Sequence, residues 1–214
     1  MRFIQKWSYF CANYLYANLH ENHSKRGVYY YGFQVVIGGI VKAVLVVIIT
    51  LLTGSLLPAM IIIGVFGSIR VLAGGYHMDT YGRCIITSLA MFVLFSIVDQ
   101  YTYKYWNNVG LLTLTAGAFL FSLVCSFMYA PKDNPNRPIT SPEEIKKFKQ
   151  LTIVYEVVLL LGTVILIMFG FKMAAMSISV GAALEIFTIT PTGHKFFDLI
   201  KGGFKKYDRK KVTR

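Results

Sequence analysis

The sequence predicts an all-α protein that crosses a membrane about six times and carries an amphipathic interfacial helix at its N-terminus. Of its 214 residues, 55% are apolar and only 15% are charged, a balance far from that of a soluble domain of this size. Its apolar segments approach the roughly 20 residues that a spanning helix needs. We therefore predict an amphipathic segment at 1–32, a transmembrane domain at 33–191 and a basic tail at 192–214.

The N-terminal segment has an amphipathic pattern. Its apolar residues recur every three or four positions, which places them on one helical stripe. They are Phe3, Ile4, Trp7, Phe10, Cys11, Tyr14 and Leu15. A stripe of this kind suits the membrane interface, and the pattern allows equally well a first helix that packs on the protein itself.

Six apolar segments follow, approximately at 33–57, 56–73, 84–98, 109–130, 151–171 and 173–191. The fourth is the clearest span, because 22 helical residues cover roughly 33 Å and the hydrocarbon core is about 30 Å thick. The second and third are short and contain glycines. Helices that break or re-enter the membrane often show this pattern, so we expect irregular backbone in this region.

The positive charge lies almost entirely on one side of these segments. If six spans place both termini on the same side, nineteen of the 22 Lys and Arg residues fall there, and Lys104 and Lys172 fall on the other. The positive-inside rule then predicts that both termini and the connection at 70–83 are cytoplasmic. This rule also explains the net charge of +12, so no nucleic-acid partner is predicted.

The densest polar stretch between two spans runs from Arg70 to Cys84. Its His77 and Cys84 are the residue types that serve as base and nucleophile in thiol hydrolases. In a straight helix their Cα atoms would be about 10.5 Å apart, whereas a direct hydrogen bond needs roughly 3 Å between heavy atoms. We therefore predict a bend near Thr80 or Gly82. The alternative is an interfacial histidine and an inert membrane cysteine.

Cysteine usage predicts neither a disulfide framework nor a metal site. The three cysteines are an odd number without paired spacing, so any special cysteine acts singly. We expect no metal and no cofactor.

Three stretches resemble the accessory gene regulator B (AgrB) family of membrane cysteine endopeptidases: 70–84, the proline-rich 130–139 and 185–191. The resemblance implies a quorum-sensing enzyme that cleaves a small membrane-bound propeptide, similar to the family's AgrD, and closes a thiolactone or lactone ring. Cys84 would be the nucleophile and His77 the base. It also implies a homodimer, a bacterial cytoplasmic membrane location and an active site on the cytoplasmic side.

Further residues are weaker candidates for contact with the substrate. Arg70 would orient the peptide or balance charge, and backbone N–H groups of Gly74 and Gly75 would bind an oxyanion. Each also has a plainer explanation: the positive-inside rule accounts for Arg70, and a simple helix break accounts for the glycines. Gln34 would contact substrate, or it would cap or pack a helix.

An acidic end of the substrate peptide would have basic residues to dock on. The candidates are Lys132, Arg137, Lys146, Lys147 and Lys149.

A rival prediction is a small transporter or exporter of peptides or ions. It starts from ionisable residues inside the spans, which are costly and often functional: Lys42, Glu156 and Glu185. Lys42 with either carboxylate would form a buried ion pair that orders the bundle, or part of an ion pathway.

Overall fold

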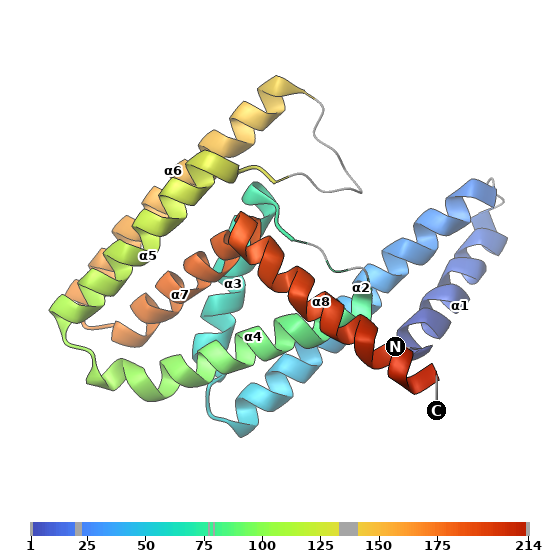
Figure 1. The fold of residues 1–214 in the computed structure, drawn as a ribbon, viewed down its shortest axis with the longest axis horizontal. Helices are drawn as coiled ribbons and strands as arrows, with labels where there is room; N and C mark the ends of the chain where they lie inside the picture. The colour runs from blue at the N-terminus through green and yellow to red at the C-terminus, as the bar shows by residue number, and fades with distance from the viewer. Residues whose placement is uncertain (1, 20–22, 77, 79, 133–140, 213–214) are drawn as a thin grey trace.

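The computed structural model describes residues 2–19, 23–76, 78, 80–132 and 141–212, and these residues form an all-α structure (Figure 1). Within these ranges there are eight α-helices and one short 3-10 helix. They are α1 (Arg2–Leu19), α2 (His23–Leu52), α3 (Leu56–Ala73), α4 (Tyr81–Thr102), η1 (Tyr103–Tyr105), α5 (Asn108–Tyr129), α6 (Pro142–Met168), α7 (Lys172–Ile189) and α8 (Pro191–Val212).

Helices α2 to α7 are each long and apolar enough to cross a membrane, which confirms the predicted fold class for the described part of the chain. The first candidate span begins at Lys25 and not at residue 33, because α2 runs without interruption from its polar start into the apolar segment. Helices α3 and α4 are each continuous despite their glycines. The irregular backbone predicted for this region lies between them.

Local sequence fixes several helix ends. The side chain of Asn107 accepts a hydrogen bond of 2.7 Å from the backbone N–H of Gly110 and so caps α5. Helix α6 begins with Pro142, whose missing N–H costs nothing in a first turn. Glu143 and Glu144 follow in the same turn, where the helix dipole favours negative charge.

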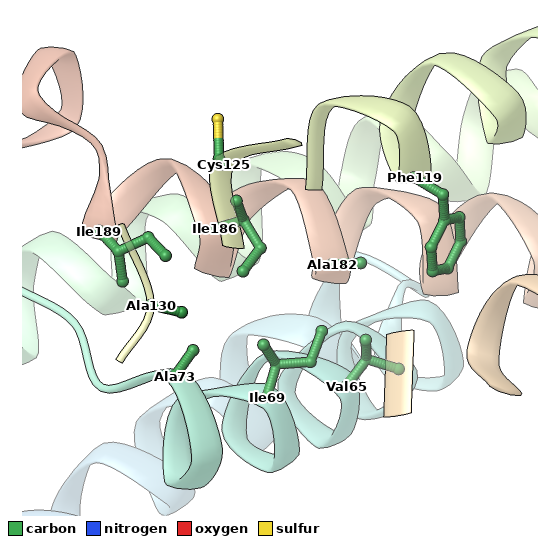
Figure 2. Close-up of a cluster of buried hydrophobic side chains, with 9 residues drawn as sticks. All are labelled: Val65, Ile69, Ala73, Phe119, Cys125, Ala130, Ala182, Ile186 and Ile189. Atoms are coloured by element: carbon green, nitrogen blue, oxygen red, sulfur yellow. The ribbon is translucent and has the colours of Figure 1, made fainter. Parts of the chain in front are cut away.

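Helix α7 is the most enclosed of the six spans. Within its apolar 18-residue stretch, 61% of the residues are buried, against 33% or less in the corresponding stretch of each other span. Figure 2 shows one face of α7 packed between α3 and α5. The cluster consists of Val65, Ile69 and Ala73 from α3, Phe119 and Cys125 from α5, Ala182, Ile186 and Ile189 from α7, and Ala130 just after α5. Any polar group on α7 therefore needs a partner from a neighbouring helix.

Buried hydroxyl pairs also hold the bundle together. Thr115 of α5 and Ser179 of α7 are 3.0 Å apart, and Ser55 before α3 lies 3.2 Å from Ser96 of α4. Inside lipid the hydrophobic effect does not drive helices together. Hydrogen bonds between helices, such as these, therefore contribute to their association.

The N-terminal helix α1 packs on α2, and it combines the two alternatives that its pattern left open. Ile4 and Ala12 are buried, whereas Phe3 is 61% and Phe10 is 63% exposed. Helix α1 therefore has one face on the protein and an outward aromatic face that suits the membrane interface.

Candidate active site

The candidate site begins where α3 ends. Gly74 has φ +79° and Gly75 has φ +149°, a backbone region that favours glycine. The chain resumes as α4 at Tyr81, after an extended Thr80. The predicted break is confirmed. Thr80 stands at its edge, Gly82 lies inside α4, and the paired glycines with positive φ begin the break directly after α3.

Cys84 lies in the first turn of α4, and its backbone N–H donates to the carbonyl of Thr80 at 3.1 Å. Its side chain is exposed and lines a cavity of about 200 Å³. Arg70, Tyr76 and Met78 line the same cavity. A cysteine in this position is open to a ligand.

His77 and Asp79 lie outside the described residues. Their described neighbours Tyr76 and Met78 both line the cavity that contains Cys84. The segment that carries His77 is therefore bordered on each side by residues of this cavity.

Arg70 joins the site to the other side of the bundle. Its Nη1 lies 3.3 Å from both carboxylate oxygens of Glu185 in α7, and its Nη2 donates to the backbone carbonyl of Tyr76 at 2.5 Å. Glu185 is fully buried, while the Arg70 side chain is 27% exposed. The guanidinium thus connects α3, α7 and the loop before His77 through charge-assisted hydrogen bonds.

Both predicted glycines lie against close neighbours. A Cβ atom on Gly75 would lie 2.7 Å from Oγ1 of Thr188 and 2.9 Å from Oε1 of Glu185, and it would overlap Arg70. A Cβ atom on Gly74 would overlap the carbonyl of Lys132. The backbone N–H of Lys132 donates to Ala73 at 2.7 Å, so this lysine is held beside the loop through its backbone.

The other residues predicted to contact substrate do not line this cavity, or they lie outside the described residues. Gln34 is half-buried on α2, and Lys146 and Lys147 are exposed near the start of α6. None of the three is among the residues that line the cavity. Lys149 stacks on Phe127, with its Nζ 4.5 Å from the ring centroid. Arg137 lies outside the described residues.

The predicted pairing of Lys42 with Glu156 or Glu185 is wrong. Glu185 pairs with Arg70, Glu156 accepts a 2.7 Å hydrogen bond from Ser126, and Lys42 lines the Cys84 cavity. The prediction failed because sequence does not show which helix faces Glu185.

One buried carboxylate was missed. Asp99 is fully buried and accepts a hydrogen bond from Ser177, but the third apolar segment was ended at residue 98, whereas α4 continues to Thr102. A longer hydropathy window would have included it. In the described part of the chain, no group of three or more His, Cys, Asp and Glu side chains is placed to hold a metal ion.

The comparison with known proteins agrees with the fold. The family model "Accessory gene regulator B" matches residues 8–189. An AgrB-like protein of Listeria innocua is 27% identical over 84% of this chain and 82% of its own length. An AgrB-like protein of Clostridium perfringens is 22% identical over 83% of this chain and 87% of its own length. No solved structure matches the chain significantly.

The match to the family model covers most of the chain. Together with the six apolar helices, it supports a multi-pass bacterial membrane protein. The chain belongs to the accessory gene regulator B family, a peptidase-like family involved in the processing of peptide autoinducers.

Proposed function

We propose that this protein is a membrane cysteine endopeptidase that removes the C-terminal part of an autoinducer propeptide and closes a thiolactone or lactone ring. The observation that carries the proposal is the shared cavity: exposed Cys84 lines it together with Tyr76 and Met78, which flank His77. Membership of the AgrB family supports the same reaction class. The substrate is an AgrD-like propeptide on the same membrane, where both partners search two dimensions.

The first step forms an acyl-enzyme. The sulfur of Cys84 attacks the carbonyl carbon at the end of the future ring, and His77 takes the thiol proton. The C–N bond then breaks and the leaving amine takes the proton from His77. The product is a thioester between Cys84 and the peptide.

The second step closes the ring. A thiol or hydroxyl of the same peptide attacks the thioester carbonyl, gives up its proton through His77, and returns the thiol to Cys84. Exchange of one thioester for another changes the bond energy little. Water competes for the same carbonyl, and the apolar walls of the cavity, among them Phe66 and Phe92, restrict its access.

Arg70 has a different role in this proposal from the one that its charge alone indicates. Because its guanidinium already binds Glu185 and the carbonyl of Tyr76, it holds the loop before His77 and leaves fewer donors for substrate. Of the two glycines, Gly74 donates its N–H to the carbonyl of Arg70 at 3.0 Å. The parallel backbone bridge between Gly74 and Lys132 directs the N–H of Gly75 toward the carbonyl of Lys132. An oxyanion at this glycine would therefore have to displace that carbonyl.

The test uses the full-length chain in liposomes with a synthetic propeptide that has an amphipathic start, a central Cys or Ser and an acidic end. The wild type should release the C-terminal fragment, and mass spectrometry should detect a peptide bound to Cys84. Cys84→Ser should abolish release, whereas Cys125→Ser, which changes a buried thiol in α5, should leave it intact. Cleavage that persists in Cys84→Ala would exclude Cys84 as the nucleophile. A wild type that cleaves nothing but moves peptides or ions across the liposome membrane would favour the transporter alternative.

A further inference from the structure

Helix α8 starts immediately after the last span and lies beyond the segment that the family model covers. Its direction is fixed by a capped turn. The hydroxyl of Thr190 accepts from the N–H of Gly193 at 3.0 Å, and the carbonyl of Thr190 accepts from the N–H of His194 at 2.9 Å. The basic tail predicted from sequence thus begins as an ordered helix whose position is tied to α7.

One face of α8 holds the side chain of Tyr76. The phenol hydroxyl donates to Oδ1 of Asp198 at 2.6 Å. The ring stacks on Phe197 with centroids 5.2 Å apart, and it meets the edge of His194 at 5.1 Å. These three α8 residues are spaced i, i+3 and i+4, so they lie side by side on one helical face.

Tyr76 is consequently held at both ends. Its carbonyl accepts from Arg70, whereas its side chain is bound by α8. Phe197 continues from this contact into the wall of the cavity that contains Cys84. Because Tyr76 directly precedes His77 in the sequence, a fixed Tyr76 limits the directions that the histidine can take.

We propose that α8 is a positioning element of the active site, and that Asp198 acts on the loop before His77 through the hydroxyl of Tyr76. This inference rests on the proposed function, since it assumes that the orientation of His77 matters for the reaction at Cys84. It gives the tail a role within the site itself, separate from any attraction of its positive charge to acidic lipids.

The first experiment is a double-mutant cycle on propeptide cleavage by the full-length chain in liposomes. Asp198→Ala and Tyr76→Phe should each lower kcat by roughly three- to tenfold, the range expected for one hydrogen bond, with little change in KM. If Asp198 acts through the Tyr76 hydroxyl, the double variant should be no slower than either single variant. Asp198→Asn keeps an acceptor oxygen and should restore most of the rate.

Lys195→Ala is the matched control. Lys195 is an exposed residue of α8 one turn before Asp198, and its substitution also changes one charge. It should leave kcat unchanged. Two results would overturn the proposal: single variants as fast as wild type, or a double variant whose loss is the product of the two single losses.

A second readout does not need the propeptide. The rate at which iodoacetamide alkylates Cys84, measured by mass spectrometry of the peptide that contains it, should fall by a similar factor in Asp198→Ala and Tyr76→Phe but not in Lys195→Ala. If wild type alkylates normally but cleaves nothing, the proposed function fails while the positioning effect stays measurable. Equal alkylation rates in all four proteins would refute the positioning role.

Discussion

At the scale of single residues, the charge of Arg70 indicates the topology of the chain, whereas its position in the structure shows which groups it binds. Its charge fits the excess of basic residues on one side of the membrane, and sequence gives no further reason for it to be exceptional. In the structure its guanidinium contacts a carboxylate 115 residues away and a backbone carbonyl of the site loop. The residue is thus a connection between elements and not merely a marker of topology.

Replacement of Gly75 tests the close packing beside Arg70. We expect Gly75→Ala to reduce cleavage roughly tenfold or more, because a strained backbone costs about 1–3 kcal/mol and the new methyl group would displace Arg70 or Thr188. Gly64→Ala is the control, since a Cβ atom on Gly64 meets nothing within 4 Å. Initial rates of propeptide cleavage check this, and normal activity in Gly75→Ala would contradict it.

Removal of the buried carboxylate tests the ion pair. Glu185→Gln leaves the guanidinium of Arg70 without its counter-charge, and we expect a loss of about 1–3 kcal/mol in the free energy of unfolding, discounted because Arg70 is partly exposed. Equilibrium denaturation in mixed micelles measures this. Glu144→Gln, at an exposed position in α6, should change stability much less; equal losses in both variants would refute the assignment.

At the scale of elements, the six spans could be predicted because lipid demands one simple property, a long apolar helix, from every one of them. The break between α3 and α4 was also predictable, since a straight helix separates His77 from Cys84. The partner of Glu185 was not predictable, because it depends on how α3 and α7 rotate against each other. The contact of Tyr76 with α8 depends in the same way on tertiary packing, and the basic pattern of the tail gave no sign of it.

The docking of α8 should depend on pH. Burial lowers the pKa of His194 below its usual value of 6.5, and the positive charge of Lys132 acts in the same direction, whereas Asp198 opposes it. The unfolded histidine therefore takes up its proton at a higher pH than the folded one. The contribution of His194 to stability is complete above pH 6.5 and is lost as pH falls through the lower folded pKa.

Hydrogen exchange can measure this effect. The amides of 191–203 should exchange faster at about pH 5 than at about pH 7.5, after correction for intrinsic rates. In His194→Gln, which does not titrate in this range, the difference should shrink. A wild-type helix with equal protection at both pH values would contradict the prediction.

Basic residues at the start of α6 give a separate prediction about the substrate. If its acidic end docks there, the double variant Lys146→Glu/Lys147→Glu should process the propeptide more slowly, and added salt should slow the wild type but not the variant, because salt screens exposed charges. Lys104→Glu, on the predicted opposite side, is the control. Unchanged processing in the double variant would remove these lysines from the docking site.

At the scale of the whole molecule, the distribution of charge predicts its orientation. Both termini and the Cys84 cavity should face the cytoplasm, with η1 outside. In a background whose three native cysteines are replaced by alanine, a membrane-impermeant thiol reagent should therefore label Lys104→Cys in intact cells. It should label Lys195→Cys only after the cells are permeabilised. The reverse pattern would invert the assigned topology. Cross-linking in the same membranes would test the expected homodimer.

The ion pair between Arg70 and Glu185 also has a consequence for biosynthesis. Arg70 belongs to the second span and Glu185 to the sixth, so the nascent chain carries an uncompensated guanidinium until its final span has been inserted. The contacts that Arg70 makes beside the Cys84 cavity can therefore be completed only after the sixth span is in place. A chain that terminates early would lack both the counter-charge of Arg70 and the helix that holds Tyr76, so under the proposed function it should not cleave the propeptide.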